Sequence, residues 1–93
     1  MAIEITHVRF SSGIQDHEHI TDCKWTSLND GSVGTSTKAT LVDWIDNKNG
    51  AAYVGSGSQR VTVGTVHPQG RTPYLRTYAD GNWTNNLLAL PTF

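Results

Sequence analysis

The chain has 93 residues, of which 37% are hydrophobic and 16% are charged, with a formal net charge of −1 and a pI near 6.4. A chain of this length folds around one core, so we expect a single domain over residues 1–93. The near-neutral charge excludes the basic footprint that non-specific nucleic-acid binding requires. Three Trp, three Tyr and two Phe argue against intrinsic disorder.

Cysteine and hydropathy patterns bear on the cellular compartment. Cys23 is the single cysteine, which allows no internal disulfide, and the sequence shows no charged-then-apolar leader and no apolar run of membrane-spanning length. We therefore expect a soluble protein of the reducing cytoplasm, with no membrane partner.

The first half of the sequence predicts two strands and one helix. Residues 2–10 and 17–25 are rich in β-branched and aromatic residues and predict strands. Residues 27–36 have no apolar period and many turn formers, which predicts a loop. The apolar period then becomes helical and predicts a helix over residues 37–48, with threonine hydroxyls at its start and Gly50 after its end.

Residues 5–10 ("ITHVRF") and 20–25 ("ITDCKW") form a short internal echo. Each segment has Ile-Thr, two variable positions, a cation and an aromatic residue. We interpret it as two strands that obey the same facing rule, with Arg9 and Lys24 on the solvent side. The side chains expected to share the other face are Thr6, Val8 and Phe10 of the first strand and Thr21, Cys23 and Trp25 of the second.

The second half of the sequence predicts an antiparallel meander. Strands are expected at residues 51–54, 59–66, 72–79 and 82–84, with turns at 55–58 and 67–70 and a two-residue turn at Asp80-Gly81. The Leu-rich tail is expected to make a short closing turn, with Asn85 or Asn86 as its cap, and to fold back on the body. The fold class is therefore α+β, a mostly antiparallel sheet of order β-β-α-β-β-β with one packed helix.

Several segments together carry a family resemblance. They are "ITHVRF", "HEHIT", "VDWI", "AYV" and "PYLRTYADGNWTNNLLALP", which span nearly the whole chain. The sequence resembles the small bacterial and phage-associated proteins of the domain of unknown function 3892. Where those proteins usually have Thr-Asp-Asn-Leu-Leu, this chain has Asn85 in place of the aspartate. The resemblance implies the domain boundaries and no reaction.

Tyr74, Arg76 and Tyr78 alternate along the predicted strand 72–79, so their side chains share one face. Two phenol rings around a guanidinium form a recognition surface for an anionic ring compound. The alternative is a structural ladder in which Arg76 stacks on the tyrosines and pairs with a carboxylate such as Asp43 or Asp80.

Trp83 and Asn86 lie just beyond the Asp80-Gly81 turn, which places them at the same end of the molecule as Tyr78. An indole stacks on a ring, and an amide both donates and accepts hydrogen bonds. The candidate ligand-binding residues are therefore Tyr74, Arg76, Tyr78, Trp83 and Asn86.

Metal and catalytic patterns are weaker. His17 and His19 would share one strand face and are the weak metal-ligand candidates, with Cys23 farther along the strand. Residues 55–58 ("GSGS") are either an anion-binding nest or a hairpin turn, and Asp43 with Asp46 is interpreted as a solvated helix face. No nucleophile elbow and no cofactor motif is visible, so catalysis is the weaker class of function.

These patterns favour a non-enzymatic protein that binds a small anionic or nucleotide-like molecule, such as a phage-type sponge for a signalling nucleotide. We expect it to form a homo-oligomer, because a small domain builds a deep pocket most easily between copies. The first alternative is an interaction module for a host protein. The second is a metal-dependent hydrolase or nuclease.

Overall fold

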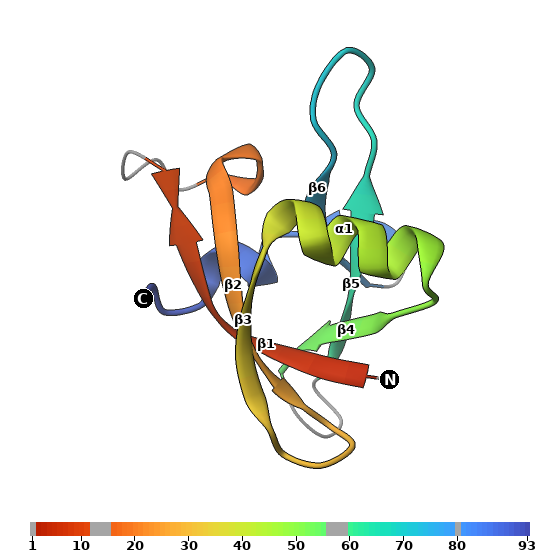
Figure 1. Cartoon of the computed structure of the whole chain (residues 1–93). Coiled ribbons are helices and arrows are strands. Elements are labelled where there is room, and N and C mark those ends of the chain that lie inside the picture. The colour runs from red at the N-terminus through yellow and green to blue at the C-terminus, as the bar shows by residue number, and fades with distance from the viewer. Residues whose placement is uncertain (1, 12–15, 56–59, 80) are drawn as a thin grey trace.

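The computed structural model of the chain describes residues 2–11, 16–55, 60–79 and 81–93. Figure 1 shows a curved sheet with one helix lying across it. The elements are β1 (Ala2–Phe10), η2 (His17–His19), β2 (Ile20–Ser27), β3 (Val33–Thr37), α1 (Lys38–Asn47), β4 (Ala51–Val54), β5 (Val61–Val66), β6 (Tyr74–Ala79), β7 (Asn82–Thr84) and η4 (Asn86–Ala89).

The strands form one seven-stranded sheet in the order β3-β2-β1-β4-β5-β6-β7. β1 and β4 are parallel, and the other neighbouring strands are antiparallel. This arrangement confirms the α+β class, the mostly antiparallel sheet and the single packed helix.

β3 is the strand that the sequence did not predict. Residues 27–36 were expected to be a loop, yet Val33–Thr37 pairs along its whole length with β2. An edge strand is held by backbone hydrogen bonds on one side and needs no apolar alternation, so its sequence carries no strand period. The prediction of a loop was wrong for this part of the segment.

The echo in the sequence becomes a symmetrical strand pair. Val8 lies directly opposite Cys23, both are fully buried, and Arg9 and Lys24 are exposed, as predicted. Strict alternation breaks where one register shift leaves Thr6 without a partner residue and the other does the same at Thr21. These threonines occupy equivalent places in the two segments. The Oγ1 of Thr6 donates to the Lys24 carbonyl and the Oγ1 of Thr21 to the Arg9 carbonyl, each at 3.3 Å.

Helix α1 begins and ends close to its predicted limits. Thr37 is the N-cap, and its Oγ1 accepts a hydrogen bond from the Thr40 amide at 3.2 Å. Leu41 and Val42 point into the core. Asn49 takes the left-handed conformation (φ 56°) that turns the chain away from the helix end.

The C-terminal segment closes the open side of β1. β4 pairs with β1 at residues 2–4, and farther along β1 the Val8 amide donates to the Pro91 carbonyl at 3.0 Å. The Arg9 guanidinium lies 4.4 Å from the centre of the Phe93 ring and donates to the Phe93 carbonyl. Leu87 of η4 is fully buried in the core. The expectation that the apolar tail folds back is confirmed, and Figure 1 shows the tail behind the first strands.

The hairpins of the second half follow the predicted positions. β4 pairs with β5 and β5 with β6, and Ala79 lies opposite Asn82 across the two-residue turn. Gly81 has the positive φ, 83°, that such a turn requires. Asp80 and most of the predicted 55–58 turn lie outside the described residues. In the part of the chain that is described, the helices are too short or too polar to cross a membrane.

Leu87 tests how far the C-terminal segment stabilises the fold. A Leu87→Ala substitution removes a fully buried side chain, and we expect it to lower the free energy of unfolding by about 2–5 kcal/mol in urea denaturation. The exposed neighbour Asn86 gives the control, because Asn86→Ala is expected to change stability by less than about 0.5 kcal/mol. Equal effects of the two substitutions would contradict a structural role for η4.

Candidate functional site

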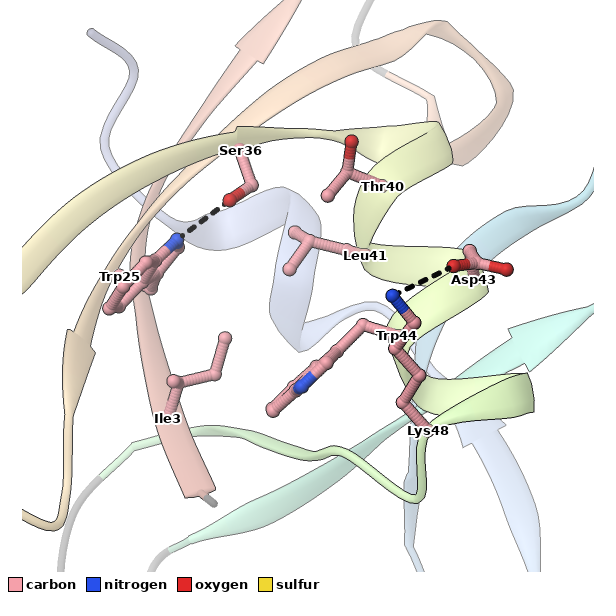
Figure 2. A pocket seen from close by; sticks show the side chains of 8 residues that line it. All are labelled: Ile3, Trp25, Ser36, Thr40, Leu41, Asp43, Trp44 and Lys48. Atoms are coloured by element: carbon pink, nitrogen blue, oxygen red, sulfur yellow. Dashed lines mark hydrogen bonds and ion pairs between the residues drawn. The ribbon is translucent and has the colours of Figure 1, made fainter.

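A cavity of about 190 Å³ lies between α1 and the β1–β3 side of the sheet. Figure 2 shows two indole rings flanking it, with apolar side chains on its floor and polar groups around its rim. Its lining residues are Ile3, Trp25, Ser36, Thr40, Leu41, Asp43, Trp44 and Lys48. They come from β1, β2, β3 and α1, with Lys48 directly after the helix. The sequence analysis did not bring these residues together.

Trp25 forms the strand-side wall of the cavity. It lies opposite Gly34 in the β2–β3 pair, and its ring covers that glycine so closely that a Cβ there would come within 2.5 Å of Cζ2. Its indole Nε1 donates a hydrogen bond to Ser36 Oγ at 3.1 Å. The glycine lets the ring lie flat on β3, and the hydrogen bond fixes its direction.

Trp44 forms the helix-side wall. The chain doubles back after α1 so that the Gly50 amide donates to the Trp44 carbonyl at 3.0 Å. This return brings Gly50 under the indole, where a Cβ would collide with the ring. Gly50 was predicted as a stop signal for the helix. Its close contact with Trp44 gives an additional reason for a glycine at this position.

The rim of the cavity carries uncharged and charged polar groups. Asp43 accepts a hydrogen bond from Asn47 Nδ2 at 2.8 Å and lies 4.0 Å from Lys48 Nζ. Both charged side chains are more than half exposed, so their pair is screened by solvent and contributes little to stability. Ser36 and Thr40 add hydroxyl groups.

The size of the cavity limits what it can hold. Apolar protein cavities of about 150 Å³ bind a single benzene ring, and drug-sized ligands need about 300 Å³ or more. A cavity of about 190 Å³ therefore fits one flat ring or one compact side chain. Indole walls favour a ring, because aromatic pairs gain energy from stacked or edge-to-face contact.

The row of Tyr74, Arg76 and Tyr78 lies on the sheet face away from the core. Leu75 and Thr77, on the opposite face of β6, are fully buried. The sequence left open which face was inward, and the structure decides it. Tyr78 of this row is exposed to solvent, and Tyr74 and Arg76 are partly buried.

Tyr78 and Trp83 form an exposed aromatic pair on this face. They lie directly opposite each other in the β6–β7 pair, with ring centres 5.1 Å apart at 71°. The Trp83 ring reaches back to β5, where a Cβ on Gly64 would lie 3.3 Å from it. Both side chains remain more than two-fifths exposed. Of the predicted site residues, these two are the ones that the structure brings into contact.

Arg76 is engaged by the chain itself. Its Nε donates to the Thr84 carbonyl at 3.2 Å, and Nη2 donates to Asn85 Oδ1 at 3.1 Å. Asn85 stands at the N-cap position of η4, but its amide makes no capping hydrogen bond there. Asn85 thus occupies the predicted cap position, but its side-chain oxygen accepts from the Arg76 guanidinium and caps no helix amide. Asn86 is exposed on η4.

Tyr74 lies under the one-turn helix η2. His17 is buried and stacks on Tyr74 at 6.2 Å and 30°, and its Nε2 has no hydrogen-bond partner among the described residues. Two contacts of Glu18 hold η2 in place. Its carboxylate pairs with Arg71 at 2.9 Å, and its backbone carbonyl accepts a hydrogen bond from Lys38 Nζ at 3.0 Å. Tyr74 is thus contacted by a different element from the one that contacts Arg76, and the predicted five residues do not line one cavity.

The two candidate metal ligands do not share a strand face. The strand predicted over residues 17–25 begins only at Ile20, and His17 and His19 belong to η2. His19 Nδ1 contacts Asp16 at 2.6 Å, and this hydrogen bond lowers the pKa of the Asp16 carboxyl below its usual value. No group of three metal-ligating side chains occurs in the described ranges. Burial, helped by Asp22, raises the pKa of the Cys23 thiol to about 12, so it is no thiolate near neutral pH.

A second polar cluster joins α1 to β5 and was missed in the sequence. Asp46 accepts from Thr65 Oγ1 at 2.6 Å and lies 2.8 Å from His67 Nε2, beside a hollow of about 270 Å³. The same Nε2 is 3.2 Å from Thr65 Oγ1. In a nucleophile–imidazole–carboxylate relay the carboxylate and the nucleophile bond to different ring nitrogens. This cluster has another geometry, in which all three groups meet at one nitrogen.

Comparison with known proteins places the chain in a family. The family model described as "Protein of unknown function (DUF3892)" matches residues 4–91. The chain belongs to the DUF3892 family. No curated protein and no solved structure matches this DUF3892 protein. The resemblance read from the sequence is confirmed. The match begins within β1 and runs past η4, and it includes all the residues that line the cavity except Ile3.

The glycines under the indole rings provide a test of how the walls of the cavity are held. At Gly34 and Gly50 φ is not in the left-handed region, so alanine is disfavoured there only by contact with the ring. We expect Gly34→Ala and Gly50→Ala to lower the free energy of unfolding by about 1–3 kcal/mol and to shift the tryptophan emission spectrum. Gly64→Ala, with its looser 3.3 Å contact, is the matched control and should cost less. Three equal effects would contradict the proposed cause.

His17 predicts a pH dependence of stability. Burial, with the Arg76 charge nearby, lowers the pKa of His17 from its ordinary value of 6.5, while Asp16 opposes this shift. As the pH falls, His17 therefore becomes protonated in the unfolded chain before it does so in the folded chain. Because protonation then favours the unfolded state, the free energy of unfolding should fall as the pH drops below about 6.5. His17→Phe keeps a ring against Tyr74 and removes the titration.

The measurement is urea denaturation from about pH 8 to about pH 5. The wild-type curve should lose more stability on acidification than the His17→Phe curve does. Parallel stability curves for the wild type and His17→Phe would contradict the prediction, because they would show that folding does not lower the pKa of His17.

Proposed function

We propose that this DUF3892 protein is a non-enzymatic binding protein that holds one flat ring of a small molecule in the cavity between Trp25 and Trp44. The observation that carries the proposal is the pair of indole walls around a space of about 190 Å³. Each wall lies against a glycine, so the rings are held in place before any ligand arrives. Such preorganisation favours affinity because little ordering is lost on binding.

The polar rim supports a ligand class. Lys48 offers a cation to an anionic substituent on the ring, and Asp43 offers acceptors to a hydroxyl or amino group. A nucleobase with its sugar and phosphate directed out of the cavity satisfies these groups, and the cavity is too small for a second base. A phage-type sponge for a signalling nucleotide is the specific biological form of this proposal.

The outer row contributes less to this proposal than the sequence led us to expect. Two donors of Arg76 are already bonded to the chain, and Tyr74 is partly covered by η2. Tyr78 and Trp83 still present an exposed edge-to-face pair on which a ring can stack. This surface is the competing location for the same kind of ligand.

Isothermal titration with indole, adenosine and AMP tests the proposal. Trp44→Leu keeps an apolar residue but removes the helix-side ring, and it should weaken binding about 5- to 150-fold, the range for loss of one stacking partner. Trp83→Leu is the matched control and should leave affinity unchanged. Lys48→Gln should weaken AMP binding and leave adenosine binding unchanged, because Lys48 is assigned to the anionic substituent.

Two results would overturn the assignment. Loss of binding in Trp83→Leu with retention in Trp44→Leu would move the ligand to the Tyr78–Trp83 surface. Failure of all three probes to raise the thermal stability of the wild type at up to about 1 mM, with no heat of binding in the titration, would reject small-ring capture, since a ligand that saturates the folded state must stabilise it.

A protein partner is the second candidate function. Two exposed apolar side chains favour it, Leu28 before the uncharged strand β3 and Val33 at the start of that strand. An aromatic side chain of such a partner would fit the same cavity by size.

A further inference from the structure

One end of the sheet is an unprotected edge. β3 is the terminal strand, and among the described residues its strand neighbour is β2 alone. Alternate residues of an edge strand direct their N–H and C=O groups away from the neighbouring strand, where another strand can bind them. Val33 at the start of β3 is 67% exposed.

The features that usually prevent edge pairing are missing from this segment. Residues 31–37 contain no charged residue and no proline, and the β2–β3 register runs without a shift. Valine and threonine, which favour strands, make up three of the five residues of β3. The opposite end of the sheet differs, because β7 has three residues and leads directly into η4.

The charges that flank β3 are self-complementary. Asp30 precedes the strand and Lys38 follows it. When two copies of such a strand run antiparallel, the acidic end of each lies toward the basic end of the other. Asp30 stands in the turn before β3, where its carboxylate accepts from Ser32, and Lys38 is the first residue of α1, where its amine donates to the Glu18 carbonyl. A parallel arrangement would place like charges together, which is unfavourable.

We propose that β3 pairs antiparallel with β3 of a second copy of this chain, so that the two sheets continue into one across a two-fold axis. Ser36 shares the inward face of β3 with Gly34 and also lines the two-indole cavity. A side chain of the second copy opposite Ser36 would lie about 4.5–5.5 Å away. The dimer thus brings the rims of the two cavities together and deepens the space next to Trp25.

The strength of this dimer is limited by its length. Stable interfaces bury about 1,200 Å² or more, and a pair of five-residue strands lies at the small end of the range. We therefore expect a dissociation constant between about 1 µM and about 1 mM. The pairing needs no ligand, so it is tested separately from ring capture.

Sedimentation velocity of the ligand-free protein from about 10 µM to about 1 mM tests the proposal. The wild type should move from the 10.2 kDa monomer toward twice that mass as concentration rises. Val33→Lys and Thr35→Lys place a charge on the edge at exposed positions, and each should keep the protein monomeric throughout. Circular dichroism with thermal unfolding shows that each variant is still folded.

Thr62→Lys is the control, because it adds the same charge at an exposed position of β5, which has strands on both sides. This variant should dimerise like the wild type. A wild type that stays monomeric at the highest concentration would overturn the proposal, and so would a dimer that persists in folded Val33→Lys. Neither result depends on whether a ring binds in the cavity.

Discussion

The stacking of indole rings on glycines is the contact on which the functional surfaces of this protein depend. Trp25 covers Gly34, Trp44 covers Gly50, and a Cβ at either glycine would overlap the ring. These contacts fix both walls of the cavity. One wall is the Trp25 ring of β2, which lies over β3, and the other is the Trp44 ring of α1. A ring held on bare backbone loses little freedom when a ligand enters, so the cavity is formed by the fold itself.

The curvature of the sheet places that cavity and the outer row on different surfaces. β1 pairs with β4 only at its start, and the remaining part of β1 is met by the C-terminal segment through Val8 and Pro91. η2 crosses to β6 and covers Tyr74. The helix lies across one face of the sheet, whereas Tyr78 and Trp83 are exposed at the end of the sheet formed by β6 and β7. The C-terminal segment and η2 thereby influence which aromatic residues reach solvent, as the covered ring of Tyr74 shows.

The cavity is defined more by its shape than by charge. Its volume and its indole walls match one flat ring, and the charged residues of its lining are the solvated pair of Asp43 and Lys48. The cluster of Asp46, Thr65 and His67 makes short polar contacts but gathers them on a single imidazole nitrogen. The match to the DUF3892 family includes this cluster and all the cavity-lining residues except Ile3, and the family description assigns no chemistry to them.

Local patterns in the sequence were sufficient for the helix capped by Thr37, the antiparallel hairpins and the inward pair of Val8 and Cys23. Each of these depends on residues close together in the chain. Three features could not be predicted in this way. They are the edge strand β3, the hydrogen bond from Arg76 to Asn85, and the cavity between the two indole rings. An edge strand needs no apolar period, and the partner of a guanidinium depends on which acceptor the fold brings near. The two indole walls belong to residues whose glycine partners lie on other strands or beyond the helix end, so only tertiary packing could bring them together.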